Sequence, residues 1–186
     1  MKWYNEPKVW KIEDGSITVE VDAGTDYWRI THYDFIRDNG HFFFEEMEGE
    51  FIAKVKVVGL YKELYDQAGL MIRIDENNWI KTGIEFVHGV QNLSAVVTRE
   101  FSDWSVVEQS TNPAHIYFTL LRKGDYVEIK YSLDNSEYKM LRLAYFPPKE
   151  KVQIGVMCAA PEGGGFRVTF ENFAIQKFEA AGTHKR

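Results

Sequence analysis

Cysteine is nearly absent from this chain, since Cys158 is the single one among 186 residues. One cysteine excludes an internal disulfide, and a chain without a disulfide framework is typical of a reducing compartment. No stretch approaches the ~18 consecutive apolar residues of a transmembrane helix. The opening MKWYNEPKVWKIEDG also lacks the apolar run of a signal peptide. We therefore expect a cytoplasmic protein without a membrane partner.

An excess of positive charge is lacking as well. The chain has 22 Lys and Arg against 28 Asp and Glu, a formal net charge of −6. Non-specific nucleic-acid binding requires a basic surface, so we expect no nucleic-acid partner. The sequence contains no phosphate loop and no dinucleotide fingerprint, and its five histidines show no zinc-ligand spacing. These absences predict no cofactor and no metal.

Long amphipathic helical patterns are missing too, whereas alternation of apolar and polar residues recurs through most of the chain. SITVEV and FIAKVKVVGL alternate in this way, and residues 115–146 are typical of three strands joined by short turns. Aromatic residues, which suit strands and binding faces, make up 15% of the chain. We predict an all-β sandwich or barrel that forms one domain over residues 1–178, followed by a disordered tail over 179–186.

The segment DQAGLMIRIDENNWIKTGIEF, residues 66–86, is predicted to form a hairpin with one apolar face. Leu70, Ile72, Ile80 and Ile84 share the parity of that face, so we expect them between the sheets. Matching the parity of the two strands requires an odd-numbered loop, and we expect three residues from DENN. We favour the register that sets Arg73 opposite Trp79, because the alternative sets Arg73 opposite Lys81, a like-charge pair.

The other face of this hairpin is the first candidate site. It carries Gln67, Arg73, Trp79, Lys81 and Glu85, and the favoured register sets Gly69 beside Gly83. We expect these five side chains to point into one groove with a notch at the glycines, and Arg73 to make a cation–π contact with Trp79. Glu85 is expected to accept a hydrogen bond from Gln67 or a basic neighbour. The alternative is an ordinary solvated sheet face.

Several motifs in order resemble one family from about Trp3 to about Ile175. They are WYNEP, DYWRITHYDFIRDNGHFF, DQAGLMIRIDENNWIKTGIEF, LSAVVTREFSDWS and GVMCAAPEGGGFRVTF. The family is domain of unknown function 1349, also described as regulation-of-enolase, concanavalin A-like. The resemblance implies a concanavalin A-like jelly-roll sandwich of two antiparallel sheets, one concave. It also implies a likeness to accessory domains of glycoside hydrolases, in which the concave face often binds saccharides. Calcium is common in such sandwiches, but no acidic calcium loop is visible here.

On that picture the hairpin belongs to the concave sheet, and two other segments join the candidate ligand-binding set. Residues 25–41 bring Trp28 and His32, in a loop that lies over the groove or in a connection that packs on the sheet edge. Trp104, in REFSDWS, is expected to form a groove wall or a lid packed on the core.

Catalytic patterns are scarce. The strand motif E-x-D-x-E of retaining glycosidases with this fold is absent, and the acidic residues of FFEEMEGEF are best explained as a solvated edge. Glu85 is the only carboxylate of the hairpin face, and a second one would come from Asp38 or Asp103 through folding. Cys158 lies in an apolar strand, which favours a buried, inert thiol.

Three functions stay open at this point. The first is a binding domain for a saccharide or sugar-like small molecule, in which tryptophan stacks on the sugar ring and polar side chains bind its hydroxyls. The second is an enzyme acting on sugars, with Glu85 as acid or base. The third is a protein-interaction or regulatory domain.

Overall fold

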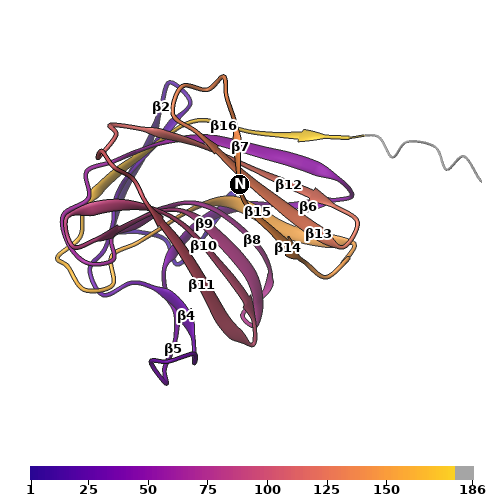
Figure 1. Cartoon of the computed structure of the whole chain (residues 1–186), viewed down its shortest axis with the longest axis horizontal. Helices are drawn as coiled ribbons and strands as arrows, with labels where there is room; N and C mark the ends of the chain where they lie inside the picture. The colour runs from indigo at the N-terminus through magenta and orange to yellow at the C-terminus, as the bar shows by residue number, and fades with distance from the viewer. Residues whose placement is uncertain (179–186) are drawn as a thin grey trace, which may run out of the picture.

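The computed structural model describes residues 1–178, and the expected tail over 179–186 lies outside the described residues. Those 178 residues form strands, turns and loops without a helix, as the alternation predicted. Two large antiparallel sheets pack face to face (Figure 1). The prediction of a jelly-roll sandwich of two antiparallel sheets is therefore confirmed.

Sheet A has seven strands and carries the hairpin of residues 66–86. Its strands are, in spatial order, β1 (Lys2–Tyr4), β6 (His41–Glu48), β15 (Lys151–Ala159), β8 (Gln67–Asp75), β9 (Asn78–Val87), β10 (Val90–Arg99) and β11 (Phe101–Glu108). The strands β8, β9 and β10 are thus central or near-central, while β11 is an edge strand.

Sheet B also has seven strands and closes the other side of the core. Its spatial order is β14 (Lys139–Tyr145), β13 (Tyr126–Ser132), β12 (Ile116–Lys123), β7 (Phe51–Gly59), β16 (Arg167–Lys177), β3 (Ser16–Glu20) and β2 (Val9–Glu13). A separate two-stranded hairpin, β4 (Tyr27–Arg29) and β5 (Ile36–Asp38), lies against the face of sheet A that points away from sheet B (Figure 1).

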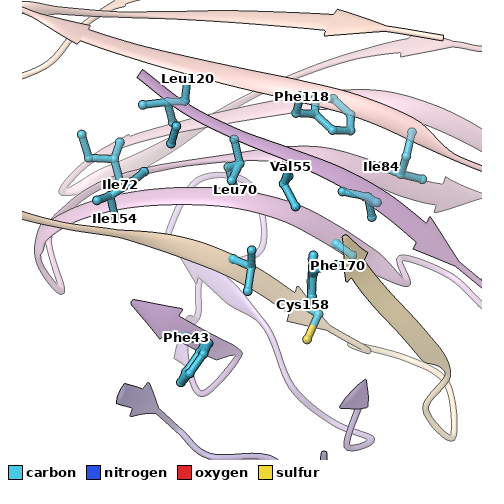
Figure 2. Packing of buried hydrophobic residues seen from close by; sticks show 14 of the residues in the cluster. Phe43, Val55, Leu70, Ile72, Ile84, Phe118, Leu120, Ile154, Cys158 and Phe170 are labelled. Carbon is cyan, nitrogen blue, oxygen red and sulfur yellow. The ribbon is translucent and has the colours of Figure 1, made fainter. Parts of the chain in front are cut away.

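The main core lies between the two sheets. Leu70 and Ile72 of β8 and Ile80 and Ile84 of β9 are buried there, as their parity predicted. Figure 2 shows side chains of both sheets meeting in this layer, among them Leu70 and Ile84 of sheet A and Phe118 and Phe170 of sheet B. Cys158 belongs to the same layer, and burial raises the pKa of its thiol, which agrees with the expected inert cysteine.

A second apolar cluster lies on the outer face of sheet A, beneath the β4–β5 hairpin. Its members are Tyr27, Trp28, Phe42, Phe44, Met71, Trp79, Val96 and Met157. The centre of sheet A is therefore covered on both faces, and the alternative of an ordinary solvated sheet face was wrong there. The reason is that period-2 alternation reports which face a side chain occupies, but not what later packs on it.

The β8–β9 register is the one favoured from the sequence. Gln67 lies opposite Glu85, Gly69 opposite Gly83, Met71 opposite Lys81 and Arg73 opposite Trp79. The connection differs from the expected three-residue loop. Glu76 and Asn77 form a two-residue turn, and a β-bulge between Arg73 and Asp75 supplies the extra residue that restores parity.

The paired glycines, Gly69 and Gly83, are required by the close approach of two strands and do not form a binding notch. A Cβ at Gly69 would overlap the carbonyl oxygen of Thr82, and one at Gly83 would overlap that of Ala68. The cavity beside Gly83 has a volume of only about 10 Å³. Such a space holds about one water molecule at most. The glycines therefore allow two strands to approach closely rather than admit a ligand.

Candidate functional site

The β4–β5 hairpin is held on sheet A by two buried cations of the sheet. The guanidinium of Arg73 donates two hydrogen bonds to the Asp38 carboxylate, at 2.7 and 3.1 Å. It also lies over the ring of Tyr4, 4.5 Å from the centroid, and Tyr4 donates a 2.6 Å hydrogen bond to Asp38. The cation–π partner of Arg73 is thus Tyr4 and not Trp79 as expected, because the bidentate bond to Asp38 directs the guanidinium toward the hairpin.

Lys81 makes the second attachment. Its ammonium donates to the backbone carbonyl of Tyr27 at 2.8 Å and to Gln67 Oε1 at 2.5 Å, and it lies 3.5 Å from Asp26 Oδ1. An ammonium has three N–H donors, and two of them are used in these hydrogen bonds, while the contact with Asp26 is an ion pair. Lys81 therefore fixes the hairpin and the side chain of Gln67.

Glu85 lies beside this arrangement with one oxygen bonded and one available. Its Oε2 accepts hydrogen bonds from Ser94 Oγ at 2.8 Å and from Trp104 Nε1 at 2.5 Å. The expected donors, Gln67 or a basic neighbour, do not make these bonds, because Gln67 Nε2 donates to the Tyr65 carbonyl and Lys81 donates to Tyr27 and Gln67. Among residues 1–178, no hydrogen-bond donor reaches Glu85 Oε1.

Burial raises the pKa of Glu85, because desolvation penalises the carboxylate form. The nearby positive charge of Lys81 and the hydrogen bonds from Ser94 and Trp104 act in the opposite direction. The burial effect is the largest of these. Glu85 is therefore a carboxyl group that holds its proton to a higher pH than an exposed glutamate does.

A pocket of about 70 Å³ opens over these groups. Its floor is polar and contains Asp26, Gln67, Lys81 and Glu85, while its walls are mostly aromatic. The wall and rim residues are Trp28, Tyr33, Phe35, Arg37, Tyr65, Trp104, Pro161 and Glu162. They come from the β4–β5 hairpin, from the loops before β8 and after β15, and from β11. Residues 25–41 thus both cover the sheet and line the pocket.

Of the eight residues predicted from the sequence to bind a ligand, some line the pocket and others do not. Five of them line the pocket: Gln67, Lys81, Glu85, Trp28 and Trp104. Arg73 and Trp79 lie on the same face but beneath the hairpin, with exposed fractions of 5% and 1%, and do not line it. His32 lines a neighbouring groove instead. The expectation that all five hairpin side chains share one groove was therefore wrong for Arg73 and Trp79.

Sequence reasoning missed several contributors. The carboxylates that join Glu85 in the pocket are Asp26 on the floor and Glu162 at the rim, and not Asp38 or Asp103, because Asp38 is paired with Arg73 while Asp103 is largely exposed outside this pocket. Ser94 lies opposite Gly83 on β10, so extending the parity argument by one strand would have identified it. Asp26 and Tyr65 reach the pocket through long-range folding, which no periodic pattern of apolar residues indicates.

Metal ligation finds little support in the described part of the chain. No group of three His, Cys, Asp or Glu side chains among residues 1–178 is arranged to hold a metal ion. That range likewise contains no helix of the length and apolar character that a membrane span requires.

The two antiparallel sheets packed face to face place the chain in the class of concanavalin A-like β-sandwich domains. The chain belongs to the family described as "Protein of unknown function (DUF1349)", which matches residues 3–178. A relative from Saccharomyces cerevisiae, called "Regulation of enolase protein 1", is 40% identical over 173 residues, which cover 93% of this chain and 87% of the relative.

Solved structures show the same fold. A functionally unknown protein from Saccharomyces cerevisiae superimposes with a TM-score of 0.92 at 39% identity, over 96% of this chain and 97% of that one. The carbohydrate-binding module CBM66 from Bacillus subtilis superimposes with a TM-score of 0.58 at 13% identity. The match covers 94% of this chain and 95% of that module. A GH43 protein from Bacillus licheniformis superimposes with a TM-score of 0.73 at 13% identity. The match covers 93% of this chain but only 36% of that protein. The last two likenesses concern the fold alone.

Proposed function

We propose that this protein is a binding domain that recognises a saccharide or a sugar-like small molecule in the pocket over Glu85. The observation that carries the proposal is Glu85 Oε1, a carboxylate oxygen in an aromatic-walled pocket without a protein donor among residues 1–178. A sugar hydroxyl is a suitable donor for such an oxygen, and the aromatic walls suit the apolar face of a sugar ring.

The distribution of donors and acceptors supports a hydroxyl-rich ligand. Lys81 directs two of its N–H donors to acceptors within the protein, whereas Glu85 Oε1 is left as an acceptor on the pocket floor. Trp104 forms one wall, and its orientation is fixed by the bond to Glu85. A ligand group that donates to Glu85 is thereby placed beside an indole ring. The named carbohydrate-binding module among the structural relatives makes a saccharide a sensible first class to test.

The test begins with a thermal-shift screen of monosaccharides, oligosaccharides, sugar phosphates and polyols on the purified protein. Hits are then titrated by calorimetry against wild type, Glu85→Gln and Glu46→Gln. Glu46 is an exposed carboxylate of β6 on the same sheet and outside the pocket, so it controls for the loss of one negative charge. We expect Glu85→Gln to weaken binding by about tenfold or more, since a hydrogen bond to a charged group contributes about 1.5–3 kcal/mol. Equal affinity in the three proteins would reject this pocket as the site.

A second candidate is an enzyme that acts on sugars with Glu85 as acid or base. The observation that favours it is the pair of carboxylates, Asp26 and Glu85, in one small pocket, together with the raised pKa of Glu85. Release of reducing sugar from any hit, lost in Glu85→Gln, would identify this activity. Binding without turnover would favour the binding domain.

A third candidate is a protein-interaction or regulatory domain. The name of the yeast relative fits such a role for that protein, and Phe101, Val107 and Leu143 of the edge strands β11 and β14 are exposed here. A protein partner would remain bound in Glu85→Gln, whereas a pocket ligand would not. A cytoplasmic location, which localisation of a tagged full-length protein would check, is proposed for all three candidates.

A further inference from the structure

A larger groove adjoins the pocket and is not used by the function proposed above. Its volume is about 960 Å³, against about 70 Å³ for the pocket. The two cavities share three lining residues, Trp28, Tyr33 and Trp104. These three aromatic side chains therefore form the boundary between a narrow pocket and a wide groove.

The groove follows the edge of the sandwich. One side is the connection between β4 and β5, with Thr31 and His32, and the other side is β14, with residues 142–145. The edge strand β11 lies between them (Figure 1). Arg142 of β14 donates a 2.8 Å hydrogen bond to Ser105 of β11, so the two sheets are joined along this groove.

Most side chains that line the groove are aromatic or able to form hydrogen bonds, and the others are Val97, Leu143 and Ala144. Phe101 and Tyr145 expose 57% and 48% of their surfaces. The Arg99 guanidinium lies 4.9 Å from the centroid of the Tyr145 ring, and an Arg142 nitrogen lies 3.9 Å from Asp103 Oδ1. Exposed rings beside paired charged groups offer flat apolar surface together with donors and acceptors. Sugar units present the same combination of an apolar ring face and a rim of hydroxyls.

The size of the pocket limits what it can hold. Ligand cavities for drug-sized molecules usually measure about 300–1,000 Å³. A pocket of about 70 Å³ therefore accommodates no more than one end of such a molecule, whereas the groove is in the usual range. Phe101 and Trp104 lie on opposite faces of β11, and β11 is an edge strand, so a ligand that continues from the pocket over Trp104 crosses the sheet edge to enter the groove.

We propose that the ligand is an oligosaccharide, with its terminal unit in the pocket over Glu85 and the following units in the groove along β11. This inference rests on the proposed function and adds the ligand's length and direction. The pocket selects the terminal unit through Glu85, and the groove contributes affinity through Phe101, Tyr145 and the arginines beside them.

The experiment compares matched length series by calorimetry: xylose with xylobiose and xylotriose, glucose with cellobiose and maltotriose, mannose with mannobiose, and fructose with a fructan trisaccharide. In the series that binds, we expect the oligomer to bind about tenfold more tightly than its monosaccharide, a difference of about 1.4 kcal/mol. Phe101→Ala and Tyr145→Ala should each remove much of that gain and leave monosaccharide affinity unchanged.

The matched control is Ile12→Ala, which truncates a side chain of similar exposure, 53%, on the opposite edge strand β2 of sheet B. It should leave all affinities unchanged, and circular dichroism checks that each variant is folded. The groove proposal is rejected if monosaccharide and oligosaccharide bind with equal affinity. It is also rejected if the higher affinity for the oligosaccharide is unchanged in both groove variants. In either case the proposed function of the pocket stands. If no series binds and the wider screen also gives no hit sensitive to Glu85→Gln, the proposed function fails and this inference fails with it.

Discussion

The indole N–H of Trp104 donates to Glu85 Oε2 at 2.5 Å, from the edge strand β11 across β10 to β9. This bond places an aromatic wall and a buried carboxylate at a fixed distance. It also favours the charged form of Glu85, against the larger effect of burial. The charge of Lys81 and the hydrogen bond from Ser94 also favour the carboxylate, while burial has the largest effect and raises the pKa of Glu85.

Replacement of Trp104 by Phe should raise the pKa of Glu85 further, because the ring remains while the donor is lost. A carbon-detected NMR titration of the Glu85 side-chain carboxyl group measures the change. Ser94→Ala removes the other donor and should act in the same direction. A lower pKa in both variants would mean that the two bonds do not stabilise the carboxylate.

Removal of the carboxyl group should make the unfolding free energy less dependent on pH. Glu85 has a raised pKa in the folded protein, so the folded state retains a proton that the unfolded state loses. The wild type therefore loses stability as pH rises from about 4.5, the ordinary value, through the raised folded value, at up to about 1.4 kcal/mol per pH unit. Below that window the group is protonated in both states.

Glu85→Gln lacks this titration, so it should gain stability relative to the wild type as pH rises through the window. Urea unfolding at a series of pH values measures the difference, with Glu46→Gln as the baseline for an exposed carboxylate. If the unfolding free energies of Glu85→Gln and the wild type differed by the same amount at every pH, the pKa of Glu85 would not be raised in the folded protein.

Arg73 and Asp38 should be strongly coupled in a double-mutant cycle. We expect Arg73→Met, Asp38→Asn and the double variant to give a coupling free energy of about 1.5–3 kcal/mol, the range for hydrogen bonds to charged groups. The Arg73 side chain is 6% exposed and the Asp38 side chain 24%, so solvent screening affects one partner more than the other. Additive effects of the two single variants would show that the Arg73–Asp38 pair does not help to hold the hairpin.

Trp79→Ala should destabilise the fold by about 3–5 kcal/mol, the usual cost of truncating a buried aromatic side chain. Trp79 is 1% exposed and packs against Tyr27, with ring centroids 6.0 Å apart, so it supports the hairpin from below. Thermal and urea unfolding test this. A stability close to that of the wild type would indicate that the hairpin cover is loose.

Gly69→Ala should be destabilising by about 3 kcal/mol, because its Cβ would collide with the backbone of β9. Gly164→Ala is the matched control, since a Cβ at Gly164 meets nothing within 4 Å and its φ lies outside the left-handed region. The comparison of their urea midpoints separates close packing from a general effect of losing a glycine. Equal midpoints would contradict the close strand approach.

The register of the β8–β9 hairpin was predictable because a buried face imposes parity, and one alternative set two like charges opposite each other. Those are local constraints. The identity of the cover was not predictable in the same way, since Lys81 meets Tyr27 across a separation of 54 residues and Arg73 meets Asp38 across 35. Alternation showed where Arg73 and Trp79 point, yet only the tertiary fold shows that a hairpin lies on top of them.

The double attachment of the β4–β5 hairpin restricts how this domain can be redesigned. Its segment supplies Asp26, Trp28 and Tyr33 to the pocket, so exchanging it is the obvious route to a new specificity. Grafting a foreign loop there would leave Arg73 buried without Asp38 and Lys81 with Gln67 as its remaining hydrogen-bond acceptor, and a stranded buried cation costs several kcal/mol. A successful graft must therefore either carry equivalents of Asp38 and of the Tyr27 carbonyl or replace both sheet cations with apolar residues. The hairpin that forms the wall of this pocket therefore cannot be replaced without changing the sheet residues beneath it.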